Sequence, residues 1–264
     1  MRMVETYFVW FVFYSILGWV YETILCSALE KRLVNRGFLN GPYCPIYGFG
    51  AVIVIGVLGR VEPIIPLFLA AVVLTCTLEY VTSWGMEKLF HARWWDYSHK
   101  KWNINGRICL LGAVAFGSLS VLLIKVIHPF VSFYTAKIPG TAMRYGSVFF
   151  FALLVADSLY TILSVLAFDQ KLRELSAEIA EFTDQTIHRY AETLKEKISE
   201  KELHDKISGI YEGFRSRMNS QEHRMLKAFP AYKSMRYNKH LQEFRQALKK
   251  LEVVKKIKGR NRNP

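Results

Sequence analysis

The sequence has few cysteines and contains none of the short motifs that mark common enzymes. Its four cysteines form no Cys-x-x-Cys pair, which argues against a disulfide framework and favours small buried side chains. There is no GxxxxGK[ST] phosphate loop, HExxH helix or GxSxG elbow, so ATP is not hydrolysed through such a loop. We therefore assign no catalytic residue, no metal and no cofactor, and an enzyme is the less favoured class.

Acidic residues are also scarce in the first two thirds of the chain. Residues 1–168 hold 13 Lys/Arg and 8 Asp/Glu, whereas residues 169–264 hold 22 and 14. The 264-residue chain is 52% hydrophobic and still carries a net charge of +13. This uneven distribution excludes a single soluble globule, a fibrous repeat and a disordered chain. We expect a transmembrane bundle over residues 1–168 and a charged cytosolic helical domain over residues 169–264.

Long apolar runs define the fold class. Five stretches, at about 7–28, 43–59, 64–90, 108–128 and 145–168, are candidates for crossing a bilayer, which takes about 20 residues, and the second is short. The prediction is an all-α polytopic membrane helix bundle of about five spans with a C-terminal cytosolic helical tail. The N-terminus has no clear basic region or cleavage site, so we interpret the first stretch as a retained span.

The distribution of basic residues predicts the orientation. Lys and Arg concentrate in the loop after the first stretch, in the loop after the third and in the tail. Cytoplasmic segments carry such an excess. With five spans, the N-terminus lies outside and the tail lies in the cytoplasm. If the short second stretch is re-entrant, the loop after the third falls on the other side.

The tail has the pattern of amphipathic helices. A helical stripe, with heptad spacing typical of a coiled coil only in its first members, is formed by Leu172, Leu175, Ile179, Phe182, Ile187, Tyr190, Leu194 and Ile198. Asn219 and Glu222 predict a capped helix start, and Pro230 ends that helix. A last helix contains Leu241, Phe244, Leu248 and Leu251.

Charge divides within the tail. Residues 169–214 carry a net charge of −4 and residues 215–264 a net charge of +12. The basic part predicts attraction to anionic lipids, and the alternative is an ordinary solvated helical domain. Nucleic-acid binding is not favoured, because no binding motif is present.

The third apolar stretch carries a polar stripe. Thr75, Glu79, Ser83, Glu87 and His91 recur every four residues, which places them on one slowly turning helix face. Intramembrane acids usually face a bundle interior or a wet cavity. The stripe therefore lines a cavity or path, or else it is structural, with Glu79 paired to an arginine or capping a loop backbone and Glu87 at the interface.

Two other stretches offer acids to the same interior. Glu22 follows Gly18 by four residues in the first stretch, and Gly18 permits close approach of another helix. Asp157 lies in the fifth stretch. The candidate counter-charges are Arg36, Arg93 and Arg107, and a carboxylate next to an arginine stays ionised.

Two loops are rich in special residues. The segment 35–48, NRGFLNGPYCPIYG, contains Asn35, Gly37, Asn40 and Gly41. Its glycines and prolines preclude a regular helix and expose backbone N–H groups, which either cradle an anion beside Arg36 or form a shaped connection.

The segment 91–107, HARWWDYSHKKWNINGR, is the second loop. Its tryptophans, among them Trp94 and Trp95, suit the lipid headgroup region. Asp96 and Asn103 are further candidates. The spacing of its histidines and Asp96 is not diagnostic of a metal site.

Four blocks in a fixed order carry a family resemblance: YSILGWVYE (14–22), NRGFLNGPYCPIYG (35–48), LEYVTSWGMEKLFHARWWDYS (78–98) and NINGRICL (103–110). The chain resembles the bacterial family of ABC-transporter type IV membrane proteins over about residues 5–130, and less closely through the fifth stretch. The resemblance implies a multi-pass, permease-like protein of the bacterial cytoplasmic membrane. A separate ATPase subunit is the expected partner, beside the lipid bilayer and a possible homo-oligomer.

Three functions follow as hypotheses. In the first, the chain is a transport-related subunit in which Glu22, Glu79 and Asp157 line or gate the path. In the second, it is a membrane enzyme acting on a lipid-linked or phosphate-bearing substrate at the cytosolic face. Glu79 or Glu87 with His91 is then the acid–base pair, and Arg36 and Arg107 hold phosphate. In the third, it is a non-catalytic scaffold or sensor.

Overall fold

The computed structural model describes residues 2–192 and 200–247, and it is predominantly helical. The helices are α1 (Arg2–Glu30), α2 (Pro45–Leu58), α3 (Ile64–Phe90), α4 (Leu110–Leu122), the π-helical turn η1 (Leu123–Ile127), α5 (His128–Ala136), α6 (Gly140–Glu192), α7 (Glu200–Arg217) and α8 (Ser220–Ala228). Residues 238–247 are also helical. Strand β1 (Ala92–Arg93) pairs antiparallel with β4 (Lys233–Ser234), and β2 (Asn103–Ile104) with β3 (Ile108–Cys109).

The predicted helical membrane bundle is confirmed. Within the described residues, four helical segments are long and apolar enough to cross a bilayer: α1, α3, α4 through α5, and α6 as far as Thr186. The second apolar stretch forms only the 14 residues of α2, about 21 Å of helix against a hydrocarbon core of about 30 Å. It is shorter than expected because Pro45 occupies the first helical turn, which leaves Tyr43 and Cys44 in the preceding loop.

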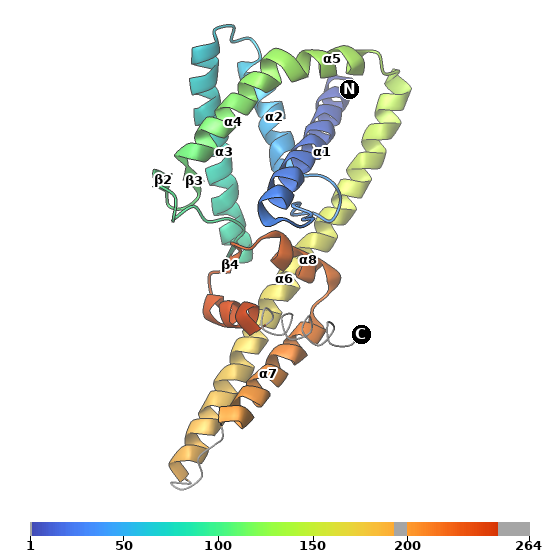
Figure 1. Ribbon diagram of the computed structural model, residues 1–264. Helices are drawn as coiled ribbons and strands as arrows, with labels where there is room; N and C mark the ends of the chain where they lie inside the picture. The colour runs from blue at the N-terminus through green and yellow to red at the C-terminus, as the bar shows by residue number, and fades with distance from the viewer. Residues whose placement is uncertain (1, 193–199, 248–264) are drawn as a thin grey trace, which may run out of the picture.

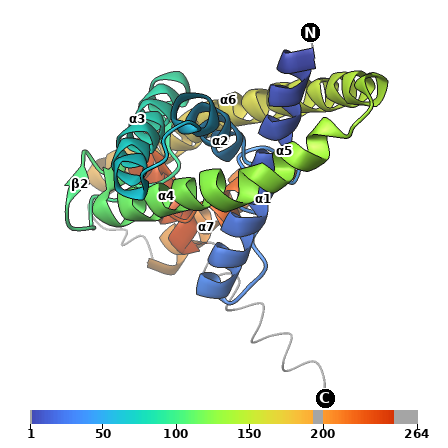
Figure 2. The same ribbon diagram turned by 90° about the horizontal axis from the view of Figure 1, so that it is seen from above.

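The fourth span is longer than the 108–128 expected. It begins at Leu110, passes through η1 and continues to Ala136. Pro129 has no N–H to offer the carbonyl of Lys125 and its ring crowds that carbonyl, which accounts for a widened turn just before α5. In Figures 1 and 2, α5 passes across α1 toward the start of α6.

The loops and tail meet at one end of the bundle, here called the tail end. The β1–β4 pair joins the loop after α3 to the tail, and Arg32 donates to the carbonyl of Lys227 over 2.9 Å. At the opposite end, Lys125 donates to the carbonyl of Val61 over 3.3 Å, and the Trp10 indole donates to Thr135 over 3.0 Å. The two basic loops therefore share an end of the bundle with the tail.

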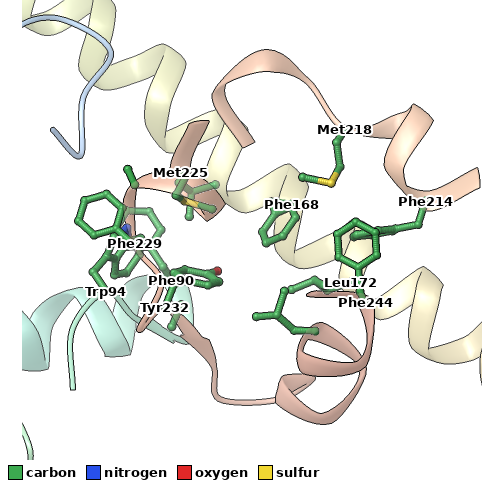
Figure 3. Close-up of a cluster of buried hydrophobic side chains, with 14 of the residues drawn as sticks. Phe90, Trp94, Phe168, Leu172, Phe214, Met218, Met225, Phe229, Tyr232 and Phe244 are labelled. Atoms are coloured by element: carbon green, nitrogen blue, oxygen red, sulfur yellow. The ribbon is translucent and has the colours of Figure 1, made fainter. Parts of the chain in front are cut away.

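Helix α6 runs without a break from the bundle into the tail. Its 53 residues are about 80 Å long, far more than a bilayer is thick. The expected domain boundary at residue 168 falls inside this helix. A single apolar cluster, here called the tail core, draws residues from both sides of that boundary (Figure 3) and includes Phe90, Trp94, Phe168, Leu172, Phe214, Met225, Tyr232 and Phe244.

Within the tail, the expected start of α8 is confirmed. The Asn219 side chain accepts from the Glu222 N–H over 2.8 Å, and Glu222 accepts from the Asn219 N–H over 2.8 Å. The helix ends at Ala228, just before Pro230. Four later members of the expected stripe, Ile187, Tyr190, Leu194 and Ile198, lie outside the residues whose side chains are described, as do Leu248 and Leu251.

Candidate functional site

The polar stripe of α3 turns toward the bundle interior in its middle. Glu79 is 6% exposed and Ser83 is 5% exposed, and both lie on the face that also buries Leu67 and Ala71. The four-residue spacing produces this shared face because four residues complete little more than one helical turn. The two polar groups are therefore held away from the lipid-facing side of α3.

Glu79 is the least satisfied acid of this face. Its Oε2 atom is buried and has no hydrogen-bond partner among the residues that the structure describes. Tyr97, in the loop after α3, is its hydrogen-bonding neighbour. Burial raises the pKa of Tyr97, and the nearby carboxylates of Glu79 and Glu22 raise it further, so the phenol stays protonated and able to donate.

Glu22 lies in the same region, on α1, but its carboxylate has both a hydrogen-bond donor and a cation as partners. The Tyr47 hydroxyl donates to Glu22 over 2.7 Å, and the Arg36 guanidinium lies 3.7 Å from the carboxylate. Gly18 makes this possible, because a Cβ at that position would lie 2.3 Å from Tyr47. The close contact of α1 with α2 thus positions the tyrosine against the acid one turn further along.

Glu87 belongs to a separate charged cluster at the end of α3. Arg93 lies 2.5 Å and Arg107 3.0 Å from its carboxylate. Arg107 also lies 3.3 Å from the Ser83 hydroxyl and is only 6% exposed. Its Nε atom is buried without a partner among the described residues. Two of the three expected counter-charges, Arg93 and Arg107, therefore pair with Glu87, and the third, Arg36, pairs with Glu22.

Asp157 is enclosed by the glycine-rich loop before α2. It accepts from the backbone N–H groups of Asn40 and Gly41, over 3.1 and 2.8 Å, and from the Tyr43 hydroxyl over 2.6 Å. The Asn40 side chain and Thr161 complete the shell. The loop does use its N–H groups on an anion, but that anion is the protein's own carboxylate. The loop is thus a shaped connection fixed to α6.

The other loop candidate, Asn35, is also bonded internally. It accepts from the Trp19 indole over 2.7 Å and from the Gly37 N–H over 3.3 Å.

A family model described as "Putative ABC-transporter type IV" matches residues 9–162, more than half of the chain. The chain belongs to this family. Comparison with curated proteins and with solved structures gives no match. The matched region of this ABC-transporter type IV protein contains α1 from Val9 onward, α2 to α5 and the acids described above, whereas α7, α8 and the tail strand β4 lie beyond it.

In this family member, the tail closes over the glycine-rich loop. Arg224 of α8 donates to the carbonyls of Gly37 and Phe38, over 2.7 and 2.9 Å, and Gln221 donates to the Phe38 carbonyl over 3.2 Å. Arg36 returns the contact by donating to the Ala228 carbonyl, and its guanidinium lies 4.7 Å from the Phe229 ring centroid. The tail thus holds the loop that in turn holds Asp157.

The loop after α3 is occupied by structural contacts. His91 has a left-handed backbone (φ 50°) and its ring lies 2.8 Å from Arg236. Asp96 is ion-paired with Lys233. Partial burial acts to raise the pKa of Asp96, but the Lys233 ammonium and the Ser98 hydroxyl and amide outweigh it and hold the pKa well below its usual range. Asn103 accepts from the Gly106 N–H over 3.0 Å and shapes the β2–β3 hairpin.

The two tryptophans differ in their environments. Trp94 is 2% exposed and packs between Phe90 and Tyr232 in the tail core (Figure 3), so its expected place among lipid headgroups is wrong. A tryptophan suits either an interface or an interior, and only the docked tail decides between them. Trp95 donates to the Arg107 carbonyl over 3.0 Å.

Sequence reasoning missed Tyr47, Tyr97 and Arg224. Tyr47 contacts Glu22 and Tyr97 contacts Glu79. In the sequence, both look like ordinary aromatic residues of a membrane protein. A search for hydroxyl groups at helix ends opposite an intramembrane acid could have found them. Arg224 lies among other tail charges, and nothing local marks it as a ligand of carbonyls some 190 residues earlier.

Proposed function

We propose that this chain is the membrane-spanning subunit of a transport system that is driven by a separate ATPase. Three facts support the proposal. The chain belongs to an ABC-transporter family, it has membrane-spanning helices, and its sequence lacks a GxxxxGK[ST] nucleotide loop. In this proposal the protein lies in a bacterial cytoplasmic membrane with the N-terminus outside and the tail inside, near anionic lipids and the ATPase.

The observation that carries a role for the interior is the unpartnered oxygen of Glu79. An intramembrane carboxylate without a partner costs several kcal/mol unless it meets water, a proton or a ligand. Glu22, Glu87 and Asp157 have such partners within the fold, so Glu79 is the acid available to passing substrate or protons. Tyr97 is its hydrogen-bonding neighbour and acts as a positioning group.

The decisive experiment asks whether an ATPase works with the chain. The protein is purified from its own membranes in mild detergent and photolabelled with an azido-ATP analogue. We expect the label on a separate polypeptide that copurifies, and none on the chain itself. Absence of any labelled partner in several mild detergents, with the chain folded and monodisperse, would overturn the proposal.

The role of Glu79 is tested in the same complex. Glu79→Gln keeps the shape and removes the charge and the exchangeable proton. We expect an unchanged melting temperature and intact copurification, with partner ATP hydrolysis no longer responding to the chain. Glu62→Gln, at an acid whose side chain is 90% exposed, is the matched control and should behave as wild type. A Glu79→Gln protein that loses stability and nothing else would make Glu79 structural.

A second candidate function, a non-catalytic scaffold, is favoured by the completeness of the other acids' shells and by the docked tail. A scaffold would retain its partners in the Glu79→Gln variant and show no ATP-dependent response in wild type. The enzymatic alternative has less support, because His91 contacts Arg236 while Arg107 contacts Glu87 and Ser83.

A further inference from the structure

A groove runs between α3 and α4 on the outside of the bundle. It has a volume of about 620 Å³ and ends at the β2–β3 hairpin. Its walls include Val73 and Cys76 of α3 and Leu110 and Ala113 at the start of α4. A volume of this size is within the range of pockets that hold small ligands, roughly 300–1,000 Å³.

The walls of the groove are apolar and belong to two spanning helices. Val73 is 67% exposed and Leu110 is 53% exposed, so the groove opens sideways to the outside of the bundle. At this position in a membrane helix bundle the surrounding medium is hydrocarbon. The groove therefore suits an acyl chain better than a polar solute.

The hairpin end of the groove is polar and cationic. Tyr80 lines the groove and its hydroxyl accepts from the Asn105 side chain over 2.9 Å. Trp102 also lines it and is 81% exposed, as a headgroup-level anchor is. Lys100 and Lys101 precede Trp102 directly and are exposed. An apolar slot whose lining residue Trp102 directly follows two exposed lysines matches a lipid with a negative headgroup.

We propose that this groove binds one acyl chain of an anionic phospholipid, with its phosphate beside Lys100 and Lys101. Binding of a lipid here does not depend on transport. It also differs from general attraction of the basic tail, because it requires a chain seated between α3 and α4 and charges in the hairpin.

Native cysteines allow a direct test in the unmodified protein. Cys76 lines the groove, whereas Cys26 lies on α1 outside it, and both are partly exposed. The purified protein in detergent is alkylated with a small maleimide in the presence of phosphatidylglycerol or of phosphatidylcholine, and each peptide is quantified by mass spectrometry. We expect phosphatidylglycerol to slow alkylation of Cys76 relative to Cys26, and phosphatidylcholine to do so much less.

The charge requirement is tested with the Lys100→Gln/Lys101→Gln variant. Each basic residue near an anionic headgroup contributes roughly fivefold in affinity at low salt, so losing both should reduce the preference for phosphatidylglycerol by roughly twenty-five-fold. The matched control is Lys31→Gln/Lys227→Gln, which removes two exposed charges at the tail end outside the groove and should retain the preference. Native mass spectrometry of retained lipid supplies a second readout that does not use the thiols.

Three outcomes would overturn the proposal. Equal protection of Cys76 by both lipids, or by neither, would show that the groove holds only bulk hydrocarbon or detergent. Protection that rises with protein concentration and ignores lipid would assign the groove to a second copy of the chain. An unchanged lipid preference in the Lys100→Gln/Lys101→Gln variant would place the headgroup elsewhere.

Discussion

Arg224→Ala should release the glycine-rich loop from the tail. In the folded protein the guanidinium donates to the carbonyls of Gly37 and Phe38, over 2.7 and 2.9 Å. The methyl group of an alanine cannot donate these hydrogen bonds. The loop also supplies the N–H groups of Asn40 and Gly41 to Asp157. The perturbation therefore begins at α8 and is expected to reach the shell of an intramembrane acid.

The magnitude follows from these two hydrogen bonds. A hydrogen bond to a charged group contributes about 1.5–3 kcal/mol. Arg224 is half-buried, so water can partly replace it and the lower end of this range applies. Two bonds at that level give about 3 kcal/mol, which is a shift of about a hundredfold in the local opening equilibrium of the loop.

Hydrogen exchange in lipid nanodiscs measures this shift. The amides of Asn40 and Gly41 report the opening directly, because each is bonded to Asp157 in the closed loop. We expect their exchange to accelerate by about a hundredfold in Arg224→Ala, since local opening free energies set exchange protection. Arg224→Lys should lie between, because an ammonium cannot reproduce the fork of a guanidinium.

Lys227→Ala is the matched control, since it removes a neighbouring exposed cation of the same helix. Its loop amides should exchange at the wild-type rate. If Arg224→Ala leaves exchange at Asn40 and Gly41 unchanged while the tail core remains protected, the two carbonyl contacts do not hold the loop and the reasoning fails.

Three further predictions concern packing, pH and topology. Gly18→Ala should destabilise the protein by about 1–3 kcal/mol and lower its melting temperature, because the new Cβ would lie 2.3 Å from Tyr47. Gly56→Ala, with open space around the new Cβ, should leave the melting temperature unchanged. Equal melting temperatures of the two variants would contradict this packing. Asp96→Asn should destabilise the protein at neutral pH. Because the folded-state pKa of Asp96 is lowered, its contribution is present above the ordinary aspartate pKa of about 3.9 and is lost as pH falls below it. The gap in melting temperature between the two proteins should therefore close below about pH 4, and a gap that ignores pH would exclude this ion pair as its cause. Finally, cysteines introduced at Ser98 and Ser216 should both be labelled only from the cytosolic side, and labelling of either from outside intact cells would refute the orientation.

The helical fold was predictable because its signals are local. Apolar runs long enough for a bilayer predicted the bundle, and the Asn219–Glu222 spacing predicted the start of α8, since a capping box closes within four residues. The family was also recognised from blocks of sequence. Each of these features depends on neighbouring residues alone.

The contacts that organise the candidate site depend on residues far apart in the chain. Strand β1 at Ala92–Arg93 pairs with β4 at Lys233–Ser234 across about 140 residues. Strands of two residues are too short to show the alternation of apolar and polar residues by which strands are predicted. The placement of Trp94 and the role of Arg224 depend on that pairing and on the docked tail. The sequence did not predict that α6 continues through residue 168, because the composition changes from apolar to charged there while the helix continues.

Spacing alone could not rank the four acids, because spacing reports the face of a helix and not the partners on the other side. Three acids of similar pattern acquire complete shells: Glu22 from Arg36 and Tyr47, Glu87 from Arg93 and Arg107, and Asp157 from the glycine-rich loop. The partners of Glu22 and of Asp157 come from the segment 35–48, and those of Glu87 come from the loop after α3. Glu79 shares the buried face of α3 but keeps an oxygen without a partner among the described residues. Since an unsatisfied buried acid must find water, a proton or a ligand, the chemistry of this bundle is best sought at that single atom.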